Sequence, residues 1–215
     1  MAFISSAFTA GQTLTAASME DLRGNANAGH SVFTNEAARD AAITAPTEGM
    51  MAYLTAPTVP AATGVTTAVP TGVTTIYNGS VWVCVTPVNA IQTATGTTTS
   101  GSYTPTLTGG GTNPSVTLTT GTTALLMLSV TGSVNPAPTT IAVGVAVSGA
   151  TTRAVAGDSN AVYVGISGGY IGMMSCAKVI TGLTAGTNTF TIQYLSGAGN
   201  TASFYDRSIT VQGIA

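Results

Sequence analysis

Residues 124–130 read Ala-Leu-Leu-Met-Leu-Ser-Val and residues 141–147 read Ile-Ala-Val-Gly-Val-Ala-Val, and these two stretches decide the fold class. In the second stretch Ile and Val alternate with Ala and Gly, which gives an extended chain one bulky face and one small face. In the first stretch apolar side chains fall on both faces. A strand of an outer antiparallel sheet normally alternates with polar residues unless something covers it. The cover over residues 124–130 is expected to be another subunit or the chain's own loops.

Further strands are expected around these two stretches. Runs of apolar and β-branched residues, separated by turn residues, continue through the C-terminal half of the chain, and such runs favour extended backbone. This spacing is typical of an antiparallel β-sandwich or jelly roll. The predicted strands cover residues 103–108, 115–119, 124–132, 140–148, 161–166, 173–180, 188–195 and 203–214.

The N-terminal part of the chain has a different pattern, which predicts a small α+β module. Leu14 and Met19 flank a predicted helix start at Thr15 and are expected to close over its first turn. A second short helix is predicted over residues 35–42, because Pro46 prevents a longer one.

A strand and a hairpin are predicted to complete this module. Residues 50–54 are expected to form the strand, and residues 55–72, rich in Thr, Pro and Ala, a long loop. Residues 75–83 contain Asn-Gly between apolar runs, which favours a two-residue turn with Ile76 facing Val81 and Thr75 facing Trp82. The predicted organisation is an N-terminal module over residues 1–86, a linker over 87–101 and a jelly-roll head over 102–215.

Charged residues are scarce, and this predicts an oligomer. They make up 6% of the chain, against roughly 25% in average soluble proteins, and none lies between Glu48 and Arg153. A monomer with so few charges has little to keep its strand edges apart. The net charge of −2 and the lack of a basic patch argue against nucleic-acid binding. No apolar stretch reaches the roughly 20 residues of a membrane-spanning helix, so membrane insertion is not expected.

The side chains that catalysis would need are also scarce. The chain has one histidine, and beyond residue 101 its carboxylates are Asp158 and Asp206. The sequence therefore predicts no enzyme, no metal site and no cofactor. Asp206 is expected to pair with its neighbour Arg207 at the surface. Cys84 and Cys176 are expected to be buried free thiols, with a disulfide between them as the alternative.

Several runs in the first part of the chain resemble a short module of tailed-bacteriophage structural proteins. These are Thr34–Ile43, Pro46–Met50 and Tyr53–Leu54, followed by a Tyr-Asn-Gly-Ser-x-Trp hairpin at Tyr77–Trp82. The opening Phe8–Ala17 is similar to starts common in the same group. This chain departs from the group by the insertion over residues 55–72, where a short acidic turn is more usual.

The C-terminal half resembles the trimeric jelly rolls related to the C1q and tumour-necrosis-factor folds. The residues that carry this resemblance are Gly182–Tyr194, Ala202–Phe204 and the final strand Ser208–Val211. In that fold the last two strands lie in the core or near the threefold axis. The two resemblances together imply a trimeric virion component, made in the bacterial host cytoplasm, with an N-terminal attachment module and a C-terminal head.

The function implied is that of a minor tail or fibre-type protein whose head faces outward and contacts the host. The alternative is a capsid decoration protein or head fibre that stabilises the major capsid lattice. The implied partners are copies of the chain itself, tail proteins or the major capsid protein, and a host-surface glycan. The residues expected at these contacts are Phe8, Leu14, Met19 and Leu22 for virion attachment, Leu126, Leu128, Val130, Phe190 and Ile192 for the trimer, and Tyr163, Tyr170 and Tyr205 for the glycan.

Overall fold

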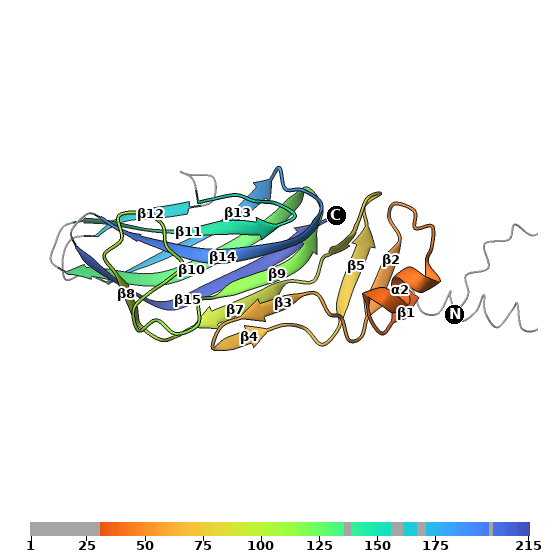
Figure 1. The fold of residues 1–215 in the computed structure, drawn as a ribbon, viewed down its shortest axis with the longest axis horizontal. Helices are drawn as coiled ribbons and strands as arrows, with labels where there is room; N and C mark the ends of the chain where they lie inside the picture. Colours follow the sequence, from red (N-terminus) through yellow and green to blue (C-terminus); the bar gives the residue numbers. More distant parts are fainter. Residues whose placement is uncertain (1–30, 136–138, 156–160, 167–170, 198–199) are drawn as a thin grey trace, which may run out of the picture.

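The computed structural model describes residues 31–135, 139–155, 161–166, 171–197 and 200–215. The molecule is elongated (Figure 1). A long β-sandwich, here called the head, occupies most of its length, and a small unit with the helix, here called the N-terminal module, lies at one end. The described residues are mainly β with a single α-helix, as the sequence predicts.

Two sheets form the head, and they are here called the β10 sheet and the β14 sheet. The β10 sheet has the strand order β13-β10-β15-β7-β4, with β8 also pairing with β15, and the β14 sheet has the order β12-β11-β14-β9-β3. Every pair within them is antiparallel. The strand bounds are β3 (Ala61–Thr63), β4 (Thr66–Ala68), β7 (Val88–Gln92), β8 (Gly96–Thr98), β9 (Ser115–Thr120), β10 (Thr123–Asn135), β11 (Thr139–Gly149), β12 (Ala161–Ile166), β13 (Ile171–Thr181), β14 (Gly186–Ser196) and β15 (Thr201–Ile214).

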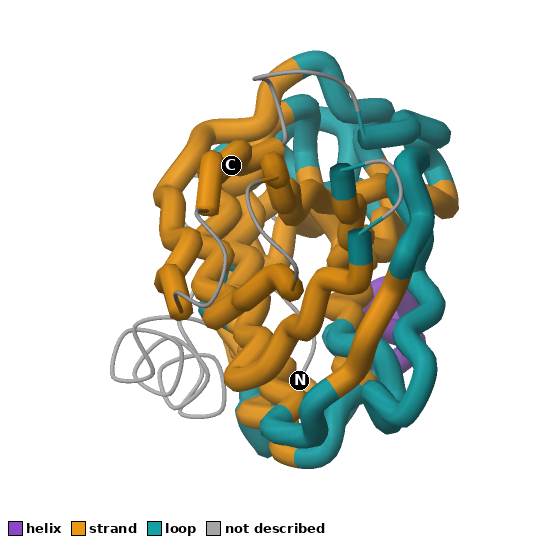
Figure 2. Tube along the Cα trace, turned by 90° about the vertical axis from the view of Figure 1, so that its left-hand side faces the viewer, coloured by secondary structure: helices purple, strands orange, loops and turns teal. Residues whose placement is uncertain are grey.

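Eight of these strands are wound as a jelly roll. With β7 and β9 to β15 counted as first to eighth, the β10 sheet reads sixth-third-eighth-first and the β14 sheet reads fifth-fourth-seventh-second. This is the order of a double-sheet jelly roll, in which the chain repeatedly crosses from one sheet to the other. Figure 2, seen from the end opposite the N-terminal module, shows strands surrounding the interior and the helix behind them. The predicted antiparallel jelly roll is confirmed.

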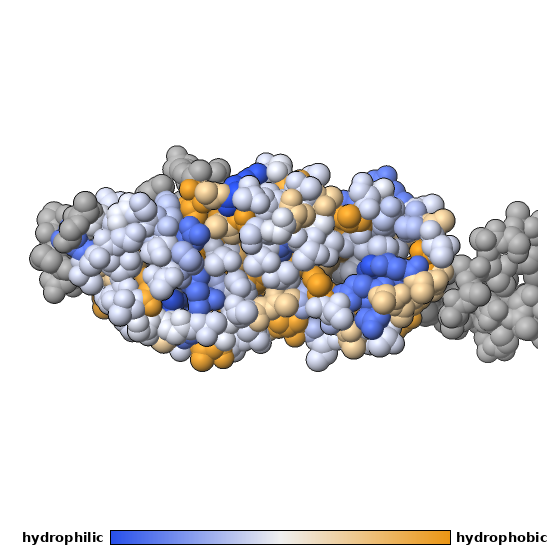
Figure 3. Space-filling view, in the orientation of Figure 1, coloured by the Kyte–Doolittle hydropathy of each residue, from blue (hydrophilic) through white to orange (hydrophobic). Residues whose placement is uncertain are grey.

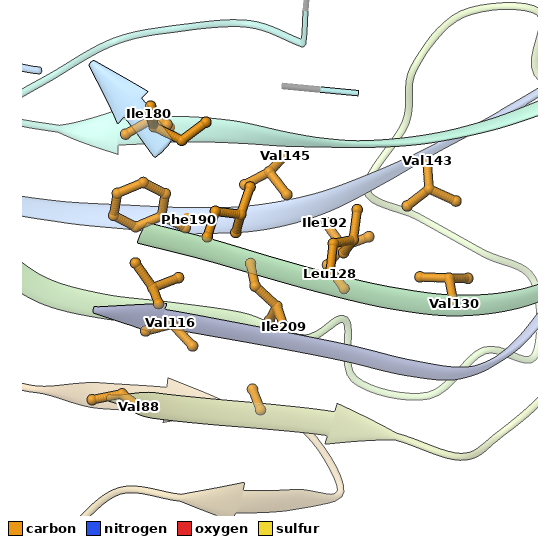
Figure 4. Packing of buried hydrophobic residues seen from close by; sticks show 14 of the residues in the cluster. Val88, Val116, Leu128, Val130, Val143, Val145, Ile180, Phe190, Ile192 and Ile209 are labelled. Atoms are coloured by element: carbon orange, nitrogen blue, oxygen red, sulfur yellow. The ribbon is translucent and has the colours of Figure 1, made fainter. Parts of the chain in front are cut away.

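The alternation of the strand sequences builds the core between the two sheets. Val143 and Val145 of β11 and Ile192 of β14 point inward and meet Leu128 and Val130 of the β10 sheet (Figure 4). All five side chains are almost completely buried. Interleaved apolar side chains of this kind are the main stabilising contribution to a sandwich.

The N-terminal module consists of one helix and a four-stranded sheet. The helix α2 (Glu36–Ala42) begins where the Asn35 side chain accepts a hydrogen bond from the Ala38 backbone N–H at 3.0 Å, as a cap residue does. The helix ends before Pro46, so the predicted helix over residues 35–42 is confirmed. The sheet order is β1-β2-β5-β6, and the bounds are β1 (Ser31–Phe33), β2 (Met51–Leu54), β5 (Val73–Tyr77) and β6 (Trp82–Cys84).

A buried arginine fastens the helix to this sheet. The guanidinium of Arg39 lies 4.7 Å above the centre of the Trp82 ring, which is a favourable cation–π distance. Its Nε also donates to the Asp40 carboxylate at 2.9 Å. Trp82 packs in turn against Tyr77, with ring centres 5.5 Å apart. The helix and the hairpin therefore form one packed unit.

The hairpin at the end of this sheet has a different register from the predicted one. Tyr77 pairs with Trp82 and Ile76 pairs with Val83, so four residues form the connection instead of two. A two-residue type I′ turn needs positive φ at both central residues, but of the pair only Gly79 has it, at +89°. Asn78 uses its side chain to accept hydrogen bonds from the N–H groups of Ser80 and Val81, which stabilises the longer turn.

The predicted long loop over residues 55–72 contains two short strands that tie the module to the head. Strand β3 pairs with β9 of one sheet and β4 pairs with β7 of the other. Residues 61–68 are therefore called the strap. The residues just before the strap are held by Glu36 of α2, whose carboxylate accepts hydrogen bonds from Thr58 and Val59 at 2.8–3.0 Å. The insertion thus has an ordered structural role.

The predicted linker over residues 87–101 is wrong, because it belongs to the head. Strand β7 lies between β15 and β4 and buries Val88, Ala90 and Gln92, and β8 pairs with the far part of β15. The predicted strand over residues 103–108 is also wrong, since that segment makes only isolated bridges, from Thr104 to Tyr194 and from Thr108 to Thr97.

Candidate functional site

The five residues predicted to form the trimer interface lie in the core of the single chain. Leu126, Leu128, Val130, Phe190 and Ile192 all point between the two sheets and are almost completely buried. The prediction of an interface at these residues is wrong. Residues 124–130 are apolar on both faces and were therefore expected to be covered by another subunit. The opposite sheet of the same chain, and not another subunit, covers their inner face.

The other face of β10 is half-buried apart from the exposed Met127, and the same face of its neighbour β13 is exposed. Cross-strand pairs on this side are Ser133–Ile171, Thr131–Met173, Ser129–Ser175, Met127–Ala177, Leu125–Val179 and Thr123–Thr181. These twelve residues are here called the outer face. Met173 is 70% exposed and Val179 is 56% exposed, and none of the twelve carries a charge.

The sequence gives little sign of this exposure. Strand β13 reads Ile-Gly-Met-Met-Ser-Cys-Ala-Lys-Val-Ile-Thr, in which apolar residues occur on both faces. Met174 and Ile180 are buried against the core, whereas Ile171, Met173 and Val179 are exposed. Lys178 lies on the same side of the strand as Met174 and is half-buried. Hydropathy alone therefore cannot distinguish the inner face from the outer face.

A β-bulge in β15 turns one arginine into the core. Asp206 and Arg207 together stand opposite the single residue Val130, and Asp206 has a positive φ of 48°. The extra residue shifts the alternation by one position, so Arg207 is 1% exposed while Asp206 points to solvent. The predicted surface pair between Asp206 and Arg207 is wrong for this reason.

The buried guanidinium of Arg207 holds the long segment between β7 and β9. It donates to the carbonyl oxygens of Ala94, at 2.8 Å, and Gly110, and to the Tyr194 hydroxyl at 3.3 Å. Tyr194 donates in turn to the Asn113 side chain at 2.8 Å. Burial raises the pKa of the Tyr194 phenol to about 12, although the nearby positive charge of Arg207 acts in the opposite direction. This cluster is buried and has a structural role.

Of the three tyrosines predicted to contact a glycan, Tyr205 is the one whose side chain the structure describes. Tyr205 is half-buried on β15, opposite Thr131. Tyr163 lies on β12, opposite Ala142, but its side chain lies outside the described residues, as does all of Tyr170. The predicted attachment residues Phe8, Leu14, Met19 and Leu22 also lie outside the described residues.

Cys84 and Cys176 are free thiols, so the disulfide alternative is wrong; Cys84 is buried as predicted, whereas Cys176 is half-buried. Burial raises the pKa of the Cys84 thiol to about 11. Within the described ranges no three His, Cys, Asp or Glu side chains gather as a metal site would require. In the same ranges no helix has the length and apolar character needed to cross a membrane.

Figure 3 shows one face of the molecule, and most of it is pale because Thr, Ser and Gly lie near the middle of the hydropathy scale. Apolar residues form separate small groups on that face. The fold and this sparsely charged surface define the chain as a jelly-roll β-sandwich protein with an appended α+β module.

Comparisons with known proteins add only distant likenesses. No protein-family model matches the sequence, and no curated protein matches it. A solved structure of infectious bursal disease virus, Gx strain, is similar with a TM-score of 0.41 and 13% identity, over 66% of this chain and 42% of that chain. The CBM22-1–GH10 modules of Clostridium thermocellum xylanase 10B, complexed with xylohexaose, are similar with a TM-score of 0.31 and 18% identity, over 47% of this chain and 20% of that chain. The chain spans less than half of either structure, and neither likeness carries an argument about function.

Proposed function

We propose that this chain is a non-enzymatic, homotrimeric structural protein of a bacteriophage particle, of the minor tail or fibre type. The N-terminal module attaches the protein to the particle, and the jelly-roll head faces outward, where it contacts the host surface. The partners of the module are other virion proteins. The chain works without a cofactor.

The observation that carries this proposal is the construction of the N-terminal module. The runs that resemble a module of tailed-phage structural proteins include α2, β2 and the Tyr77–Trp82 turn. In the structure these separate runs pack into one unit, in which Arg39 lies over Trp82. The unit is joined to the head by paired strands of the strap. This arrangement supports a rigid two-part protein with one end for attachment and the other for display.

The scarcity of charge supports the oligomeric part of the proposal. Across the head the charged residues that are described are Arg153, Lys178, Asp206 and Arg207, and Arg207 is buried. So few surface charges provide little protection against association. An assembled state that covers part of the apolar surface is the stable arrangement for such a chain.

The test is to locate the protein on purified particles by electron microscopy with antibodies raised against the whole chain. Label at the tail or its tip is expected. Label spread over the capsid would instead support a capsid decoration protein or head fibre. Particles that carry no label, and in which mass spectrometry does not detect the chain, would reject a virion role altogether. Cleavage of host-surface glycans by the purified protein would refute the non-enzymatic assignment.

Attachment through the module can be tested with a full-length variant. Trp82→Ala removes the ring that contacts both Arg39 and Tyr77, and Tyr205→Ala is the control, an aromatic truncation in the head. We expect the first variant to be lost from particles and the second to be retained. Equal incorporation of both would show that the module does not attach the protein.

A further inference from the structure

We propose that copies of this chain associate through the outer face of β10 and β13. This inference rests on the oligomeric part of the proposed function and names the surface that forms the contact. It replaces the interface that the sequence predicted at Leu126, Leu128 and Val130, which point the opposite way from the same strand.

The composition of the outer face is the first argument. Ile171, Met173, Val179 and Met127 are four of the eight large apolar side chains that are exposed among the described residues. A fifth, Ile214, extends the same side of the sheet on β15, opposite Thr123. These five side chains form two groups on either side of the central Ser129–Ser175 row, and exposed apolar groups gathered on one face mark candidate interaction sites.

The size of the outer face is the second argument. Strand β13 has 11 residues, which at about 3.3 Å per residue gives a length of about 36 Å. Two strands about 4.8 Å apart, with the adjoining strip of β15, give roughly 500 Å² of surface. In a trimer each copy would bury this face against its two neighbours, which amounts to roughly 1,500 Å² over the three copies, within the range of specific protein interfaces.

The edge position of β13 is the third argument. Strand β13 is the last strand of the β10 sheet, and its outward side chains are Ile171, Met173, Ser175, Ala177, Val179 and Thr181. Natural proteins usually protect a long edge with outward charges, proline or a short strand. Strand β13 is long, contains no proline and has a single charged residue, Lys178, which lies on its inner side. Its outward side therefore has no charge to protect it, and a covered edge is its stable state.

The pattern along the face indicates that the occupant is a second copy of the chain. If the copies are related by rotation about an axis parallel to the strands, each residue keeps its position along that axis. Each cross-strand row therefore meets the same row of the neighbouring copy. The apolar rows Leu125–Val179 and Met127–Ala177 then meet the same apolar rows, and the central Ser129–Ser175 row meets hydroxyl groups that can donate and accept. Because the rows carry no charge, identical copies meet without repulsion.

The experiment compares the assembly of full-length variants by sedimentation velocity. Val179→Asp and Met173→Asp each place a carboxylate on the outer face. Val65→Asp is the matched control, because Val65 is 59% exposed but lies in the strap. We expect the wild type and the control to sediment as trimers of 21.2 kDa chains. The two outer-face variants should dissociate at least about 100-fold more readily, since a carboxylate is costly to bury without a partner.

A second measurement needs no variant. Amide hydrogen exchange of the wild type is followed at concentrations above and below its dissociation midpoint. The amides of β13 should lose protection on dilution, while those of β14, which lies inside its sheet, should not change.

Several outcomes would overturn the inference. Trimers that persist in both outer-face variants, dissociation that is equally strong in Val65→Asp, or unchanged exchange of β13 on dilution would each reject this surface. Such results would leave the virion role standing, because that role depends on where antibodies label the particle. A wild-type chain that is monomeric at micromolar concentration would reject both this surface and the trimeric part of the proposed function.

Discussion

The buried Arg207 gives the sharpest test of how the head is held together. Arg207→Ala removes the donors of two hydrogen bonds to backbone carbonyl oxygens, that of the half-buried Ala94 and that of the buried Gly110. Hydrogen bonds from a charged group contribute about 1.5–3 kcal/mol each, so the two together contribute about 3–6 kcal/mol. Part of this is offset because Nε of Arg207 finds no hydrogen-bond partner among the described residues. The expected loss in the free energy of unfolding is therefore about 3–5 kcal/mol.

The chain contains a matched control for this substitution. Arg153 also donates to two backbone carbonyl oxygens, those of Thr181 and Gly182, but at the protein surface. Water can replace the lost donor there, so Arg153→Ala should cost less than about 1.5 kcal/mol.

The assay is urea unfolding of both variants, supported by thermal melting. For a chain of this size, 3–5 kcal/mol corresponds to a fall in Tm of about 6–20 °C. Equal destabilisation by Arg207→Ala and Arg153→Ala would refute the reasoning, because it would mean that burial of the guanidinium adds nothing to its hydrogen bonds.

Three further predictions follow from the same core. Leu126→Ala should lower the free energy of unfolding by about 2–5 kcal/mol, whereas Leu125→Ala, half-buried on the outer face, should cost clearly less in the same urea assay. The free energy of unfolding should fall as the pH rises from about 10 to about 12, because the pKa of Tyr194 in the folded protein is raised to about 12. The total loss is about 2–3 kcal/mol, and Tyr194→Phe should flatten the dependence of the unfolding free energy on pH. Iodoacetamide at pH 8 should alkylate Cys176 at least about tenfold faster than Cys84, since Cys84 is buried with a pKa near 11; peptide mass spectrometry gives both rates.

Most of the strands could be predicted from the sequence because their signals are local. The alternation in residues 141–147 depends only on neighbouring residues, and the strand predicted over residues 140–148 is present as β11. Strand β7 was missed because its partner β15 lies more than a hundred residues away, and its own five residues are too few to show a clear pattern. Short strands of this kind are defined by what they pair with.

The candidate surface was harder to predict than the fold. Residues 124–130 are apolar on both faces, so hydropathy could not tell which face the opposite sheet covers. Arg207 was expected at the surface as the charged neighbour of Asp206, whereas the bulge at Asp206 turns it into the core. A bulge depends on the strand that faces it, which a single sequence does not reveal.

The strap determines how the protein would respond to a mechanical load. A pull on the N-terminal module reaches β3 and β4, whose hydrogen bonds run across to β9 and β7. When the pull acts along the strands, these bonds are sheared together and cannot open one at a time, and both layers of the head share the tension. The junction between the two parts should therefore resist extension far better than a flexible tether of the same length.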